Sequence, residues 1–116
     1  IEKNPKACSL IKEISNLLKI GGQNYKLINS DISKYLKNPQ NFSEIVQFDI
    51  IFADPPYSSE IYKNIFEGIF NSKLLTDEGI LVVEYSENYK IEIPEYFQSI
   101  KEKSYGTTNV IIMQLN

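Results

Sequence analysis

The sequence predicts one α/β domain with a mostly parallel sheet and an antiparallel final strand pair. Two short runs, 48–53 and 80–83, are apolar almost throughout, which is typical of parallel strands that helices cover on both faces. Segments with helical spacing of apolar residues precede these runs, at 7–18 and 61–70. Near the end, a short link containing Gly106 joins two further strands and indicates an antiparallel hairpin. This alternation of helices and strands favours α/β architecture.

The first predicted helix has clear boundary signals. Asn4 is a suitable N-cap, Pro5 occupies the first helical position, and Gly21 lies beyond the end. Its apolar stripe consists of Ala7, Leu10, Ile11, Ile14, Leu17 and Leu18. Cys8 falls in this stripe, so we expect a buried thiol and not a nucleophile. As the single cysteine, it also excludes an internal disulfide.

The next segments are short. We expect a strand at 25–28, a turn at Asp31, and a weak helix over 32–37 that Pro39 must end. Positions 38–47 are rich in Asn, Gln and Ser and predict a surface loop.

In the second half of the chain we expect a helix that begins after Ser58 or Ser59, either of which can act as its N-cap. The apolar side of this helix combines Ile61, Ile65 and Ile69 with Tyr62, Phe66 and Phe70. After the helix we expect a turn at 76–79, a strand at 80–83 and a loop at 84–94. Two final strands are expected at 97–103 and 110–115.

Composition restricts the chemistry. With 116 residues and 42% apolar content, the chain fits one domain. Because the sequence has no His, it excludes Ser-His-Asp and Cys-His catalysis and the usual zinc sites. The net charge is −3 and every basic residue is Lys, so nucleic-acid affinity is not visible in the charge balance. We therefore expect chemistry based on carboxylates, backbone groups or a cofactor.

Targeting signals are not apparent in the sequence. No run approaches the roughly 20 apolar residues of a membrane span, and no basic-then-apolar leader precedes the first motif. We expect a soluble protein in a reducing, cytoplasmic compartment. The chain begins at Ile1, and Ile1-Glu2 is similar to the end of a strand, so we expect a fragment of a longer protein.

The motif Asp54-Pro55-Pro56-Tyr57 follows the most apolar predicted strand. In open α/β sheets, ligands bind at the carboxyl ends of the strands, so its location alone indicates a site. The two prolines restrict the backbone of Asp54 and Pro55 to extended geometry, which leaves the Pro55 carbonyl free to face a ligand. A simple turn with a packed Tyr57 is the competing interpretation.

A planar group bearing an NH2 fits these groups. The Asp54 carboxylate and the Pro55 carbonyl can accept its two N–H bonds, while Tyr57 stacks on its ring. Holding both hydrogens turns the nitrogen lone pair toward an electrophile, which is catalysis by orientation and electrostatics. This chemistry needs neither His nor a metal.

With this motif the chain resembles the amino-methylating enzymes that use S-adenosyl-L-methionine, and more narrowly the RsmD-like family of bacterial small-subunit (16S) rRNA guanine-N2 methyltransferases. The stretches that carry the resemblance are IEKNPKACSLIKEISNLL, INSDISKYL, FDIIFADPPY, LLTDEGILVVEYS and KSYGTTNVIIM. The resemblance implies a Rossmann-like class I methyltransferase sheet. It also implies that the first strand, the Gly-rich loop and a basic RNA-gripping extension are missing, and that the fragment alone is inactive.

The resemblance also implies roles for single residues. Glu2 would bind the cofactor's ribose hydroxyls, Asp31 would accept from the adenine amino group, and the backbone N–H of Ile32 would contact the adenine ring. A solvated Glu2 and a plain N-cap at Asp31 are the competing interpretations. Asp54, Pro55, Pro56 and Tyr57 would form the catalytic group that holds a guanine extruded from 16S rRNA.

Three other functions compete with this one. An N6-adenine methyltransferase acting on DNA or RNA would use the same grip on an exocyclic amine. Glutamine N5 methylation fits less well, because the enzymes that perform it have Asn at the position of Asp54. A non-catalytic scaffold that retains the fold would belong to a different class.

Overall fold

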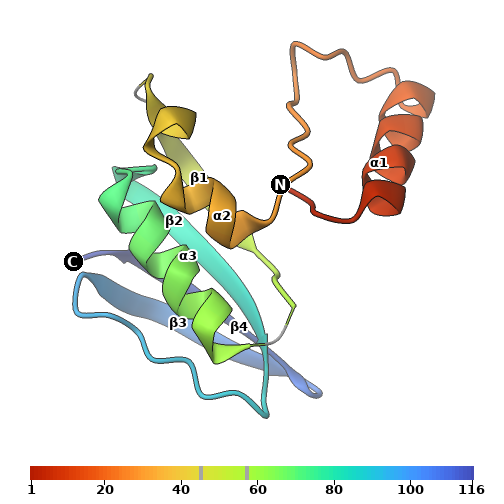
Figure 1. The fold of residues 1–116 in the computed structure, drawn as a ribbon. Helices are drawn as coiled ribbons and strands as arrows, with labels where there is room; N and C mark the ends of the chain where they lie inside the picture. The colour runs from red at the N-terminus through yellow and green to blue at the C-terminus, as the bar shows by residue number, and fades with distance from the viewer. Residues whose placement is uncertain (45, 57) are drawn as a thin grey trace.

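The computed structural model describes residues 1–44, 46–56 and 58–116. In chain order the elements are α1 (Pro5–Leu17), α2 (Ile32–Lys37), the 3₁₀ helix η1 (Pro39–Phe42), β1 (Phe48–Ala53), α3 (Ser59–Asn71), β2 (Leu75–Ser86), β3 (Phe97–Tyr105) and β4 (Thr108–Leu115). Figure 1 shows α2 and α3 lying over one face of the sheet, whereas α1 stands apart from it.

The four strands form one mixed sheet in the order β1-β2-β4-β3. β1 runs parallel to β2, with Ile50 opposite Ile80 and Ala53 opposite Val83. β4 pairs antiparallel with both β2 and β3. The β3–β4 hairpin turns at Gly106, whose φ of 62° is accessible to glycine at little cost. These pairings confirm the predicted α/β fold with its antiparallel final pair.

Parallel pairing extends less far than the sequence predicts. Among the described residues it is confined to β1–β2 and to one isolated bridge between Glu2 and Asn29. The segment 25–28 pairs with no other strand among the described residues, so the prediction of a strand there is wrong. The bridge nevertheless ties the start of the chain to the segment that enters α2.

Side-chain caps mark the starts of α1 and α3 at residues that the sequence predicts. The Asn4 side chain accepts hydrogen bonds from the backbone of Lys6 and Ala7, with Pro5 following it. Ser58 caps α3 through Ile61. These caps satisfy backbone N–H groups that have no partner within the helix. None of the helices among the described residues is both long enough and apolar enough to cross a membrane.

The core lies between α3 and one face of the sheet. Its most buried side chains come from α3 and the two central strands: Phe66, Leu75, Leu81, Val83 and Met113. Phe66 contacts Phe97 of β3 with ring centroids 5.8 Å apart. The predicted apolar side of α3 is therefore confirmed, except that Phe70 is exposed and stacks on Tyr96.

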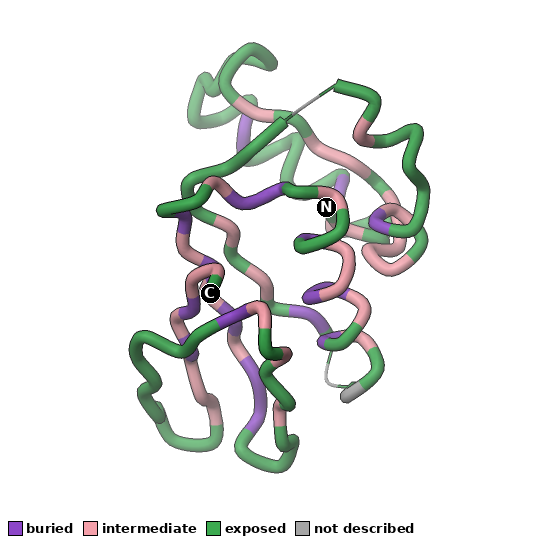
Figure 2. Tube along the Cα trace, turned by 90° about the vertical axis from the view of Figure 1, so that its left-hand side faces the viewer, coloured by how far each residue is buried: buried purple, intermediate pink, exposed green. Residues whose placement is uncertain are grey.

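β1 differs from its prediction as a central strand covered on both faces. It is an edge strand, and only its Ile51 and Ala53 side pack against the core. Ile50 and Phe52 on the opposite side are 66% and 61% exposed. Burial along the whole trace is shown in Figure 2, where the buried positions follow the sheet and the neighbouring helix while the connecting loops are largely exposed.

The apolar stripe of α1 is likewise uncovered. Cys8 is buried as predicted, and its thiol donates to the carbonyl oxygen of Glu2 at 3.4 Å. Leu10, Ile14 and Leu17 are exposed, because α1 does not pack on the sheet. Helical periodicity correctly predicts the apolar side of α1 but not its burial.

Three loop predictions need correction. The turn expected at 76–79 lies inside β2 as an irregularity of the β1–β2 register, where the Thr76 hydroxyl donates to Asp49 at 3.2 Å. The loop expected from position 84 begins after Ser86, because pairing with β4 extends β2. The loop predicted at 38–47 contains η1.

Gly68 allows α2 to approach α3 closely. A Cβ at Gly68 would lie 2.6 Å from the Cβ of Leu36, an atom that cannot swing away. We expect Gly68→Ala to lower the free energy of unfolding by about 1 kcal/mol or more, since overpacking costs roughly 1–3 kcal/mol and helix propensity returns at most about 1. Urea denaturation measures this.

Gly22→Ala is the matched control for this substitution. Nothing lies within 4 Å of the Cβ it would add, so we expect a change below about 0.5 kcal/mol. Equal effects of the two substitutions would contradict the close approach.

Candidate functional site

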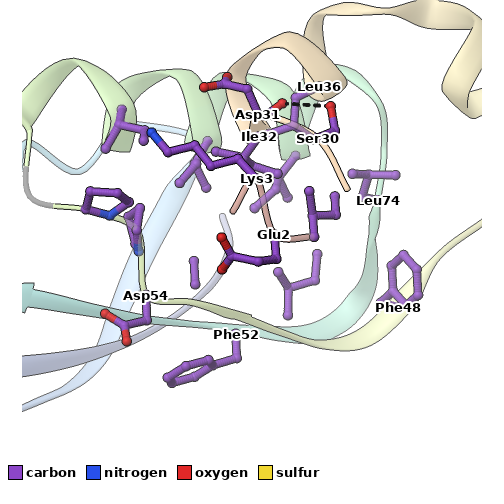
Figure 3. Close-up of a pocket in the computed structure, with 18 of the residues that line it drawn as sticks. Glu2, Lys3, Ser30, Asp31, Ile32, Leu36, Phe48, Phe52, Asp54 and Leu74 are labelled. Carbon is purple, nitrogen blue, oxygen red and sulfur yellow. Dashed lines mark hydrogen bonds between the residues drawn. The ribbon is translucent and has the colours of Figure 1, made fainter. Parts of the chain in front are cut away.

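A cavity of about 760 Å³ lies between β1 and the two segments joined by the Glu2–Asn29 bridge. Its apolar lining includes Phe48, Leu74 and the isoleucines of α3. Its polar lining comes from Glu2, Lys3, Ser30, Asp31 and Asp54. Figure 3 shows these five polar residues together with Phe48 and Leu74. The volume falls in the range of ligand sites in proteins, roughly 300–1,000 Å³.

Asp54 follows the last residue of β1, at the carboxyl end of the parallel strand pair. It is exposed, and its carboxylate forms no hydrogen bond or ion pair with any other described residue. Figure 3 shows this carboxylate directed away from Glu2. The Asp54 side chain is therefore available to a ligand and is not used to staple a loop.

The prolines that follow differ in exposure. Pro55 is buried and Pro56 is exposed, and both line the cavity. The rigid backbone that the sequence predicts for this segment stays a prediction. Tyr57 lies outside the described residues, so its stacking role stays a prediction.

Glu2 is held on both sides by backbone hydrogen bonds. Its N–H donates to Ile28 at 2.9 Å, and its carbonyl accepts from the N–H of Ser30 at 3.1 Å. In its half-buried side chain, Oε1 accepts from the backbone N–H of Asn4 at 2.7 Å. Since one carboxylate oxygen is occupied, the other is the acceptor that remains for a ligand.

Asp31 both caps a helix and lines the cavity. Its Oδ1 accepts from the backbone N–H of Lys34 at 3.1 Å, so it caps α2. It also lines the cavity together with Ile32, the first residue of α2. The Glu2–Asn29 bridge brings this helix start beside Glu2, although the two acids are far apart in the sequence.

The structure therefore brings Glu2, Asp31, Ile32, Asp54, Pro55 and Pro56 to one cavity. Sequence reasoning missed Lys3 and Ser30, which also line it. Neither belongs to a recognisable motif, and only the bridge places them there. Glu84, an acid at the end of a buried run, is not among the cavity-lining residues, and its backbone carbonyl accepts from Tyr62 at 3.2 Å.

Two other features bear on chemistry. Over the described part of the chain, no group of three or more His, Cys, Asp or Glu residues could hold a metal ion. Burial, and secondarily the carboxylate of Glu67, raise the pKa of the Tyr96 phenol. Tyr96 does not line the cavity, so this shift has no part in the site.

Comparison with known protein families decides the assignment. Residues 1–114 match the family described as conserved hypothetical protein 95. The chain belongs to this family. The match covers nearly all of the chain, including every residue of the cavity.

Two curated relatives carry a functional name. The ribosomal RNA small subunit methyltransferase D of Haemophilus influenzae is 24% identical over 114 residues, which cover 98% of this chain and 58% of that protein. The protein of the same name from Buchnera aphidicola is 25% identical over 88 residues, covering 76% of this chain and 44% of its own length. The chain thus matches 58% of the length of the first of these relatives and 44% of the second.

Solved structures show the same fold. The candidate methylase HI0767 of Haemophilus influenzae superposes with a TM-score of 0.82 at 24% identity, covering 98% of this chain and 69% of its own. The candidate methyltransferase yhhF of Escherichia coli superposes with a TM-score of 0.83 at 22% identity, and the match covers 99% of this chain and 60% of the yhhF chain. The fold is therefore the Rossmann-like α/β fold of methyltransferases, as the sequence predicts.

The capping role of Asp31 can be separated from its charge. We expect Asp31→Ala to lower the free energy of unfolding by about 1 kcal/mol, because the Lys34 N–H loses its acceptor. Asp31→Asn keeps an equally good cap and should stay within a few tenths of a kcal/mol. Thermal or urea denaturation distinguishes the two. A loss of stability in Asp31→Asn equal to that in Asp31→Ala would contradict the capping role.

Proposed function

We propose that this chain carries the catalytic segment and part of the cofactor site of an enzyme that methylates the exocyclic N2 amine of a guanine in 16S rRNA, using S-adenosyl-L-methionine. The observation that carries the proposal is the position of Asp54 and Pro55 at the carboxyl end of β1, in the same cavity as Glu2 and Asp31. The names of the curated relatives support an rRNA substrate. The partner is then 16S rRNA or an assembling small subunit.

The residues present fit part of such a cofactor. The remaining oxygen of Glu2 can accept from ribose hydroxyls, and Asp31 with the Ile32 N–H can contact an adenine edge. When bound, the cofactor supplies a methyl group on a positively charged sulfur. Glu2 and Asp31 would hold it in the cavity that Asp54 also lines.

Asp54 and Pro55 would hold the target amine. Their two oxygens can accept its two N–H bonds and turn the nitrogen lone pair out of the plane of the base. The Asp54 carboxylate also stabilises the positive charge that develops on the nitrogen during transfer. The base must first leave its stack to reach this position. Tyr57 is proposed to receive the extruded base on its ring.

The charge of the chain limits its share in substrate binding. With a net charge of −3 and no Arg, these residues offer little attraction for phosphates. These residues are therefore expected to contribute little to the grip on RNA phosphates. The described residues that line the cavity include no glycine, and we expect the isolated chain to be inactive.

Asp54→Ala in the complete protein tests the mechanism. We expect methyl transfer to fall by about 100-fold or more, since an aligned catalytic acceptor is lost, while cofactor affinity stays within a few fold. Transfer of a radioactive methyl group to small-subunit rRNA measures the first, and calorimetric titration the second. Asp77→Ala, an exposed acid on β2, is the control. Normal turnover in Asp54→Ala would refute the mechanism.

The identity of the labelled base tests the substrate in the same experiment. Digestion of the methylated RNA should yield N2-methylguanosine. Label recovered as N6-methyladenosine would leave the amine grip intact but overturn the guanine assignment.

Glu2→Gln in the complete protein separates cofactor binding from catalysis. The amide oxygen can keep the hydrogen bond from Asn4, whereas the NH2 group replaces the oxygen left for the cofactor. We expect cofactor affinity to fall about tenfold, as for one lost hydrogen bond to a charged group. Turnover at saturating cofactor should stay near normal. Unchanged affinity, measured by titration calorimetry, would remove Glu2 from the site.

A further inference from the structure

The carboxyl ends of three strands lie along one edge of the sheet. β4 is antiparallel to both β2 and β3, so β3 runs in the same direction as β1 and β2. Tyr105, the last residue of β3, is opposite Thr108, and Thr108 is in turn opposite Ser86 at the end of β2. Tyr105 and Asp54 therefore lie at the same edge, at the ends of the two outer strands. Figure 1 shows the tip of the β3–β4 hairpin at this end of the sheet.

Tyr105 combines exposure with a neighbouring cation. It is 56% exposed, and its side chain forms no hydrogen bond with any other described residue. The ammonium nitrogen of Lys103 lies over the ring, 5.0 Å from its centroid. A ring that can stack on a base, beside a cation that can pair with a phosphate, is the combination with which proteins bind unpaired nucleotides.

The register of β3 sorts its charges onto two faces. Glu102 lies on the face that carries the core, where its carboxylate accepts a hydrogen bond from the phenol of the core residue Tyr85. Because side chains alternate along a strand, Lys101, Lys103 and Tyr105 share the other face. Both lysines are exposed. They present positive charge beside Tyr105, although the net charge of the chain is −3.

The hairpin holds this ring in place. Tyr105 pairs with Thr108, so only two residues link β3 to β4. The N–H of Glu87 donates to the carbonyl of Thr107 at 2.9 Å, which ties the tip to the residue that follows β2. A ring on a restrained strand end loses little conformational freedom when a ligand stacks on it.

The separation between Tyr105 and Asp54 determines what the ring can contact. β1 and β3 are three strand spacings apart in the sheet, which is roughly 14 Å at about 4.8 Å per spacing. This is too far for Tyr105 to contact the base whose amine Asp54 would hold. It is, however, only about four steps of a stacked strand at about 3.4 Å per nucleotide. Tyr105 is thus placed for a neighbouring nucleotide of the same strand.

We propose that Tyr105 and Lys103 form a stacking platform for the RNA that flanks the target base, with Tyr105 stacked on a base within about four nucleotides of it and Lys103 paired with an adjacent phosphate. The inference rests on the proposed function, since it takes RNA as the substrate. Extrusion of the target base removes a stacking partner from its neighbours, and the platform replaces part of that stacking. Because every base has a stacking face, the platform contributes affinity and tolerates different sequences.

The RNA affinity of the complete protein tests the platform. We expect Tyr105→Ala to weaken binding of small-subunit rRNA by about tenfold, because the stacked base loses its ring. Tyr105→Phe keeps the ring and should stay within about twofold. Ile100→Ala is the control, since it shortens a side chain of similar exposure, 52%, on the same strand, and should also stay within about twofold. Filter binding measures each dissociation constant.

Kinetics and salt dependence separate the platform from catalysis and from folding. In Tyr105→Ala the KM for RNA should rise by the same factor, whereas kcat and cofactor affinity should stay within about twofold. Lys103→Gln should reduce the slope of log affinity against log salt by about 0.7, the value for one phosphate contact on a single strand. Lys103 is exposed, so this variant tests the platform even where Tyr105→Ala does not fold.

Hydroxyl-radical footprinting locates the contact on the RNA. Nucleotides protected by the unaltered protein should lose protection in Tyr105→Ala only within about four positions of the methylated guanine. Loss of protection elsewhere, unchanged RNA affinity in Tyr105→Ala, or an unchanged salt slope in Lys103→Gln would overturn the platform. Unchanged affinity for free rRNA with weaker binding to the assembling subunit would instead make a protein the partner. The proposed function fails separately, by absence of methyl transfer from the unaltered protein.

Discussion

The parallel pairing of β1 with β2 is the interaction on which the arrangement of the site depends. It places the end of β1, and with it Asp54, at the carboxyl edge of the sheet. It also turns Ile51 and Ala53 toward α3, so the core and the candidate catalytic residue are fixed by the same register. A slip of one residue would exchange the buried and exposed sides of β1 and redirect the Asp54 segment.

A second, smaller contact completes the cavity. The Glu2–Asn29 bridge is a single parallel pair, yet it sets Glu2 beside Asp31 and faces both toward β1. The hydrogen bonds of Glu2 to Ile28, Ser30 and Asn4 spread this restraint over the local backbone. The polar residues that line the cavity thus come from two places in the fold, the end of β1 in the sheet and the bridged segments outside it. The proposed roles follow that separation: Glu2 and Asp31, near the bridge, would bind the cofactor, and Asp54, at the end of β1, would hold the target amine.

The sequence predicts the site better than it predicts the surroundings. Asp54-Pro55-Pro56 is a local motif, and the strand before it and the helix after it are visible in the spacing of apolar residues, so its position could be predicted. Glu2 and Asp31 could be proposed only through family resemblance, because no local pattern links residues that far apart. Lys3 and Ser30 carry no signal at all. The turn expected at 76–79 is instead an irregularity inside β2, because Leu75 before it and Ile80 after it both pair with β1.

The errors in predicted burial share one physical cause. Periodicity reports which side chains are apolar, but it cannot report what covers them. The residues of β1 are almost all apolar, yet Ile51 and Ala53 are partly buried while Ile50 and Phe52 face solvent. The same holds for Leu10, Ile14 and Leu17 of α1. Exposed apolar area costs about 25 cal/mol per Å² relative to burial, so a strand that faces water gains by carrying polar side chains, as β3 does with Lys101, Glu102 and Lys103. Two-sided apolarity on β1 therefore predicts cover on both faces of this strand, whereas in this structure only the face toward α3 is covered.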